Sequence, residues 1–202
     1  MQRRDLFKLT LASAGLAALP ARAAERCAGD GTPAQFMPKS APDPKAAEND
    51  IEKHRKCPYC GMDRKEFHHS RMLVQYSDDL PDGTCSLHCA AISLSLNLDR
   101  EPKLIYVADN ASGADPKPLV EVDKATFLVG SRLKGVMTQR SKVAYGTEAA
   151  AKAAKDANGG ELMNFDQALA AAYADMARDV SGIRKMRAER RKKMMEKMEH
   201  HG

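Results

Sequence analysis

Regularly spaced apolar residues divide the middle of the chain into two similar halves. In the first half, residues 71–77 (RMLVQYS) alternate apolar and polar side chains, which predicts a strand. Residues 78–83 contain the Asp, Pro and Gly of a turn, and Ser86 begins a helix that continues to about Asn97. Residues 103–108 (KLIYVA) predict a second strand.

The second half repeats this order after a linker rich in Gly, Pro and Asp. The predicted elements are the linker 110–118, strands at 125–130 and 142–145, a helix from Thr147 to the glycine pair at 159–160, and a closing strand at 161–165. Residues 166–198 are helical by composition. Their first part is apolar enough to pack on the body, whereas the part after Gly182 is basic and rich in methionine.

These elements predict an α+β fold with two small related ββαβ-type units followed by a long C-terminal helix. The expected divisions are a signal peptide at 1–23, a flexible leader at 24–50, a first unit at 51–110, a second unit at 119–177 and a helical tail at 178–202. Both halves can be written strand, helix, strand, with an irregular segment that carries candidate ligands first. Met137, which follows a predicted strand, is expected to hold the place in the second half that Met62 holds in the first.

The first 23 residues have the three parts of an export signal. Paired arginines, Arg3 and Arg4, are followed by an apolar run at 9–19 and by small residues that suit signal peptidase at 20–23. The apolar run is too short to span a bilayer stably. The arrangement resembles a twin-arginine signal, which predicts a periplasmic protein.

The formal charge of +5 lies at the two ends of the chain. Residues 1–23 contribute +3 and residues 178–202 contribute +5, which leaves −3 for the body between them. The basic pI therefore does not indicate a nucleic-acid-binding body, and no nucleic-acid partner is expected. The basic tail instead predicts docking on an acidic partner or on an anionic membrane surface.

Soft metal ligands gather in two short segments, 57–62 and 85–89. They are Cys57, Cys60, Met62, Cys85, His88 and Cys89. A C-x2-C pair on a turn brings two sulfur atoms within reach of one ion, and a second pair on the first turn of a helix completes the set. Cu(I) prefers thiolate and thioether ligands, whereas zinc takes four Cys or His ligands in a closed site.

Two other interpretations use the same cysteines. In an exported protein they can form structural disulfides, either Cys57–Cys60 and Cys85–Cys89 or crossed pairs. A thiol-disulfide oxidoreductase needs its C-x-x-C pair at the start of a helix, where the helix dipole lowers the thiol pKa. Here Gly61 and a charged run follow the pair instead.

The residues 57–63 (CPYCGMD), the later run 127–131 (FLVGS), Met137 and the segment 145–165 with its glycine pair resemble the NosL family of nitrous oxide reductase accessory proteins. The resemblance spans roughly residues 50–170. The cysteine segments alone also resemble the small TRASH or YHS metal-binding modules.

The NosL resemblance implies a periplasmic, non-enzymatic Cu(I) chaperone that delivers copper to nitrous oxide reductase. It assigns copper binding to Cys60 and Met62 through the shared C-x-x-C-G-M motif, and to Met137 as the downstream methionine. The chain departs from the family pattern in lacking a clear lipid-attachment site, in the additional Cys85–Cys89 segment and in its basic tail. The alternative function is a zinc-bound or disulfide-stabilised binding module that docks through this tail.

Overall fold

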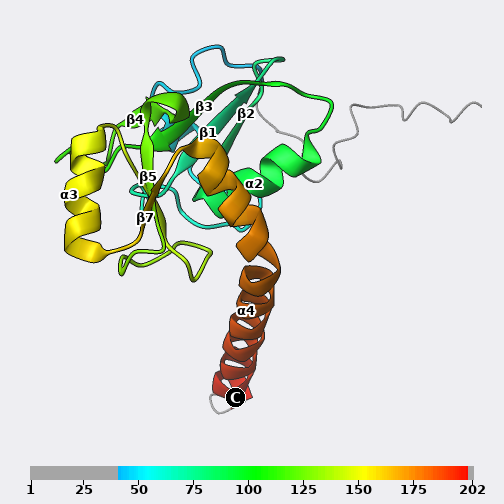
Figure 1. Ribbon diagram of the computed structural model, residues 1–202. Helices are drawn as coiled ribbons and strands as arrows, with labels where there is room; N and C mark the ends of the chain where they lie inside the picture. The colour runs from blue at the N-terminus through cyan, green and yellow to red at the C-terminus, as the bar shows by residue number, and fades with distance from the viewer. Residues whose placement is uncertain (1–40, 200–202) are drawn as a thin grey trace, which may run out of the picture.

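The structure, a computed structural model, describes residues 41–199. The expected signal peptide at 1–23, Cys27 and the final residues 200–202 lie outside the described residues. Two small antiparallel sheets stand beside each other, each accompanied by a helix, and a long helix leaves the body at the C-terminal end (Figure 1). The expected α+β class is therefore confirmed.

The first sheet has four strands in the order β2-β1-β3-β4, all antiparallel. Its strands are β1 (Met72–Tyr76), β2 (Pro81–Thr84), β3 (Pro102–Ala108) and β4 (Leu119–Glu121). Helix α2 (Leu87–Leu96) connects β2 to β3 and contacts β1 and β2. A one-turn helix, α1 (Asp50–Lys53), precedes this unit.

The second sheet has three strands in the order β6-β5-β7, again antiparallel. Its elements are β5 (Thr126–Val129), β6 (Lys142–Tyr145), helix α3 (Glu148–Asn158) and β7 (Glu161–Met163). A 3-10 turn, η2 (Val122–Lys124), joins the two sheets. Each unit has the chain order ββαβ with its first strand in the centre, so the two units share one topology.

Local sequence signals set the helix ends of the second unit. The Thr147 hydroxyl accepts a hydrogen bond from the Ala150 N–H, as an N-cap does, and Gly159 ends α3 with a φ of 69°. Helix α4 (Phe165–Glu199) begins with a reciprocal cap. There, the Asn164 side chain accepts from the Gln167 N–H, and the Gln167 side chain accepts from the Asn164 N–H.

Three segments differ from the expected organisation. Residues 81–84 form strand β2, although the sequence predicted a turn at 78–83. Strand β4, at the start of the expected second unit, pairs with β3 and so belongs to the first sheet. Residues 41–50 of the expected flexible leader pack on the body, where Ala46 and Asp50 are buried.

One hydrophobic core joins the two units and the first part of α4. It contains Met72, Val74 and Tyr76 of β1, Ala90 and Ala91 of α2, Phe127 and Val129 of β5, and Ala168 and Ala172 of α4. The side chains are mostly aliphatic and small, as expected for a chain without tryptophan. The shared core fixes α2, which carries two of the candidate ligands, against the start of α4.

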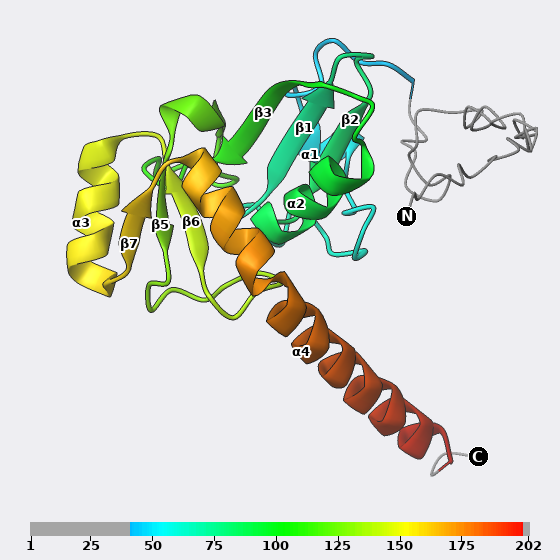
Figure 2. The ribbon, with the colours of Figure 1, turned by 45° about the vertical axis from the view of Figure 1, so that its right-hand side comes forward.

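Helix α4 changes character along its length. Its first half buries Asp175 and Asp179 as well as the core alanines, whereas every side chain described from Arg184 onward is exposed. This second half extends away from the body (Figure 2). Among the described residues, none of the helices combines the length and apolar character that a bilayer crossing requires.

Candidate metal centre

The first pair of cysteines lies on a closed loop ahead of β1. The Cys57 N–H donates to the Met62 carbonyl at 2.9 Å, and the Gly61 N–H donates back to the Cys57 carbonyl at 2.8 Å. Gly61 has a φ of 78°, a conformation that glycine adopts without steric cost. These bonds fold the loop back on itself, so that Cys57 and Cys60 present their sulfur atoms to the same place.

The second pair comes from the junction of β2 and α2. Cys85 follows the last residue of β2, and Cys89 lies in the first turn of α2, four residues later. Residues at this spacing lie on one face of a helix. Both side chains are fully buried, so the body holds them in fixed positions.

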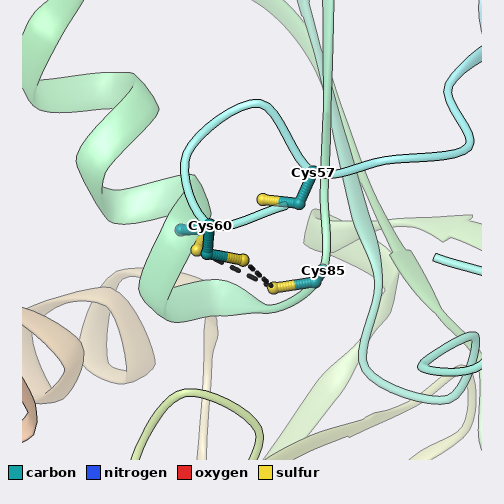
Figure 3. A group of neighbouring side chains, drawn as sticks. Cys57, Cys60 and Cys85 are labelled. Atoms are coloured by element: carbon teal, nitrogen blue, oxygen red, sulfur yellow. Dashed lines mark hydrogen bonds between the residues drawn. The ribbon is translucent and has the colours of Figure 1, made fainter. Parts of the chain in front are cut away.

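The two pairs meet as one cluster of four thiols. The sulfur atoms of Cys57, Cys60, Cys85 and Cys89 all lie within 4.8 Å of one another. Cys60 Sγ is 3.4 Å from Cys85 Sγ (Figure 3), and Cys85 Sγ is 3.7 Å from Cys89 Sγ. All four are free thiols, and Cys60 is the one that is half-exposed.

The thiols perturb one another strongly. The pKa of Cys57 is held far below its usual range because the thiols of Cys60, Cys85 and Cys89 donate hydrogen bonds to its sulfur. The pKa values of Cys85 and Cys89 are raised, chiefly by these same contacts with Cys57 and Cys60 and also by burial. The cluster thus stabilises a thiolate among thiols, and a soft cation would replace the protons that they share.

Two methionines complete the surroundings of the cluster. Met62 and Met137, both half-buried, pack against the cysteines together with Val136. Met137 has a φ of 60°, which is uncommon for a residue other than glycine and is found at functional sites. The expected equivalence of the two methionines is wrong, because Met62 precedes β1 whereas Met137 lies in the connection between β5 and β6.

His88 is next to Cys89 in the sequence and is buried, but its side chain contacts α4. Its Nδ1 lies 3.5 Å from Asp179 Oδ2 of α4. Burial lowers the pKa of His88, and the Asp179 carboxylate opposes that effect. The compact group of potential ligand atoms among the described residues comprises the four cysteines without His88. The His88–Asp179 contact instead ties α2 to α4.

Buried charges beneath the cluster hold its two halves together. Arg64 is fully buried, and its guanidinium donates to Asp50 Oδ2 at 2.7 Å, to the His54 carbonyl at 2.7 Å and to the Thr84 carbonyl at 3.1 Å. Thr84 immediately precedes Cys85, so this one side chain connects the loop of Cys57 to the strand that presents Cys85. No sequence pattern indicates this role, because Arg64 lies in a charged run, DRKE, that is typical of an exposed loop.

A second network fixes the tip of the cysteine loop. The Tyr59 hydroxyl donates a short hydrogen bond to Asp82 of β2, which also accepts from the Ser93 hydroxyl at 2.6 Å. Burial raises the pKa of the Asp82 carboxyl, and the hydrogen bonds from Ser93 and Tyr59 counteract it in part. Because Tyr59 stands between Cys57 and Cys60, its anchor limits the movement of both sulfur atoms.

The C-terminal helix reaches the cluster as well. Arg187 of α4 donates from its guanidinium to the Cys60 carbonyl at 3.3 Å. The exposed half of α4 is therefore held against the cysteine loop at one point. The basic composition of this segment predicts a tail separate from the metal-binding unit and does not indicate the contact.

The donor set fits a soft metal ion. Zinc–thiolate bonds of about 2.3 Å place the sulfur atoms of a tetrahedral site roughly 3.8 Å apart, close to the separations between these thiols. Cu(I) is also satisfied by two or three of the same sulfur atoms, with thioethers as further ligands. The described residues therefore form a sulfur-rich site whose chemistry suits zinc or Cu(I).

Comparisons with known proteins support a specific family. No curated protein matches the chain. The crystal structure of the copper chaperone NosL from Shewanella denitrificans shows 26% sequence identity and a TM-score of 0.46, with 55% of this chain and 87% of that chain covered. The family model described as NosL matches residues 48–173, which include all four clustered cysteines and both methionines. Because this match covers more than half of the chain, the protein belongs to the NosL family.

Proposed function

We propose that this protein is a copper chaperone that binds Cu(I) at the four-cysteine cluster and passes it on without catalysing a reaction. The observation that carries this proposal is the convergence of four free thiols on one point, with the thioethers of Met62 and Met137 packed against them. Membership of the NosL family supports copper as the cargo. Sulfur ligands of both kinds favour Cu(I) over hard cations.

The exposure of the ligands suits transfer of the ion. Cys57, Cys85 and Cys89 are buried, whereas Cys60, Met62 and Met137 are half-buried and lie toward the surface. An incoming ligand from a client protein can approach the ion from this side and replace one sulfur at a time. The buried cysteines retain the ion until the last bond is exchanged.

The reduced protein is expected to bind Cu(I) tightly, and Cys60→Ala/Met62→Ala is expected to weaken this binding by about 100-fold or more, because two of the soft ligands are lost. Competition with a Cu(I)-specific chelator under anaerobic conditions measures the affinity. Cys27→Ala/Met186→Ala is the matched control, since it removes one thiol and one thioether that the proposed site does not use. Equal affinity of both double variants would place the copper site elsewhere.

A structural zinc site is the second candidate, because four cysteines at tetrahedral spacing are also what zinc requires. The two functions differ in what the purified protein retains. Protein purified under reducing conditions should contain about one equivalent of zinc that a Cu(I) chelator leaves in place if the site is structural. Copper that exchanges with the chelator supports the chaperone.

We further propose that the client is an exported cuproenzyme, with nitrous oxide reductase as the first candidate, and that the chaperone works in the periplasm. Cell fractionation tests the location, because the variant Arg3→Lys/Arg4→Lys should accumulate in the cytoplasm.

The exposed half of α4 is the candidate docking element. It carries lysines and arginines on most of its faces, which suits an acidic protein surface better than a bilayer, because a helix lying on a membrane needs one apolar face.

Docking through α4 is expected to depend on its charge and on salt. Lys193→Gln/Lys197→Gln removes two exposed charges from one face of α4 and should slow association with the copper-free client, with a weaker dependence on ionic strength. Lys152→Gln/Lys155→Gln on α3 removes the same number of exposed charges from another helix and serves as the control. Identical association rates for both variants in surface-binding measurements would exclude α4 as the docking element.

A further inference from the structure

The exposed half of α4 carries an unusual set of apolar side chains. Six large hydrophobic side chains are exposed among the described residues, and four of them are methionines of this helix. They are Met186, Met194, Met195 and Met198, with exposed fractions of 63%, 58%, 63% and 73%. Leucine would serve a helix equally well and pack better, so the shared feature of these positions is the thioether sulfur.

Three of these methionines lie on one side of the helix. At 3.6 residues per turn, Met194, Met195 and Met198 fall within an arc of about 100°, and they lie within about 6 Å of one another along the axis. Residues three and four apart on a helix are neighbours, and the flexible methionine side chain allows its sulfur to move toward a common point. Three thioethers on one turn can therefore surround a single ion.

The same side of α4 faces the cysteine loop at its other end. Arg187, which donates to the Cys60 carbonyl, falls within the arc of the three methionines, and Met194 lies seven residues beyond it. The methionine turn is thus about 10 Å farther along the helix axis than the point of contact with the cluster. Met186 stands about 130° from the centre of the arc and does not belong to the group.

We infer that Met194, Met195 and Met198 form a second Cu(I) site, weaker than the cysteine cluster. Neutral thioethers bind Cu(I) and discriminate against zinc and other harder cations, but they hold it less tightly than anionic thiolates do. The lysines and arginines around the turn suit Cu(I) that arrives in an anionic thiolate complex. The inference rests on the proposed function for the identity of the metal, but it concerns residues that the cysteine cluster does not use.

Titration of the full reduced chain with Cu(I), supplied from a weak chelator without oxygen, tests the site. Two classes of Cu(I) binding are expected. The methyl resonances of the three methionines are observed after methyl labelling of methionine. They should shift only while the weaker class fills. Met194→Leu/Met195→Leu/Met198→Leu should weaken the second class by about tenfold or more while the first is unchanged. Met186→Leu is the control and should retain both classes.

The outcome separates this inference from the proposed function. In Cys60→Ser/Cys85→Ser the tight class should disappear while the three methyl resonances still respond to Cu(I). If the cysteine cluster proves to hold zinc instead, the same response of the methionines still supports the tail site. Methyl resonances that do not move, or a second class of binding that survives in the triple leucine variant, would overturn the inference.

Discussion

Asp50→Asn is expected to lower the free energy of unfolding by about 3–5 kcal/mol, because it leaves two buried guanidinium groups without their counter-charge. Asp50 Oδ2 accepts from Arg64 at 2.7 Å and from Arg71 at 2.9 Å, and all three side chains are buried. Asparagine keeps the size of the side chain, so the loss measures charge and hydrogen bonding rather than a cavity. Urea unfolding of the metal-free, reduced protein gives the value.

Acid should reduce the difference in the free energy of unfolding between the parent and Asp50→Asn. Burial alone would raise the pKa of Asp50, but the hydrogen bonds and charges of Arg71 and Arg64 outweigh it and hold the pKa below its usual range. The stabilisation is therefore fully present above the pKa of an unfolded aspartate, about 3.9, and is lost as the pH falls through the lower folded value. The free energies of unfolding of the parent and the variant should converge only in that acid range.

A matched carboxylate at the surface serves as the comparison. Glu148 pairs with Lys152 at 2.6 Å, but both side chains are well exposed, so Glu148→Gln should change stability little. A loss for Asp50→Asn no larger than that for Glu148→Gln would mean that the buried arginines find other partners. The support of the cysteine loop by Arg64 would then have to be reconsidered.

The regular elements could be predicted because their signals are local. Strand β6 and helix α3 lie where alternation, the Thr147 cap and the glycine stop placed them. The missed strand β2 shows the limit of such signals. Pro81, Asp82 and Gly83 have the composition of a turn, yet Asp82 is buried to accept hydrogen bonds from Tyr59 and Ser93. A side chain at Gly83 would meet His54 at 2.6 Å.

The site could be predicted in part for the same reason. The spacing of the cysteines indicated one metal site, and the structure brings those four thiols together. The partner of His88 depends on the packing of α4 against α2, far apart in sequence, so its spacing to Cys85 was no guide to its contacts. The roles of Arg64 and Arg187 likewise arise from contacts across the fold, and residue type alone does not indicate them.

Cys89→Ser is expected to remove about a quarter of the stability that metal binding adds to the protein. Where structural metal sites contribute about 10–16 kcal/mol through four ligands, each ligand accounts for about 2.5–4 kcal/mol. Cys89 is fully buried, and its sulfur lies 3.7 Å from that of Cys85, so no solvent-exposed group can take its place. The increase in melting temperature on adding metal to the reduced protein should therefore be smaller in the variant by the share of one ligand.

The metal-free proteins provide the internal reference. A buried serine hydroxyl without a partner costs about 1–3 kcal/mol in either form, so only the difference between metal-bound and metal-free protein reports on ligation. Ala91→Ser places the same hydroxyl at another fully buried position of α2. It should lower the melting temperatures of the metal-bound and the metal-free protein equally. A different result would contradict the metal site: Cys89→Ser lowers the melting temperature of both forms equally, and the four clustered thiols of the parent react with a thiol reagent only after reduction. The cysteines would then be structural disulfides.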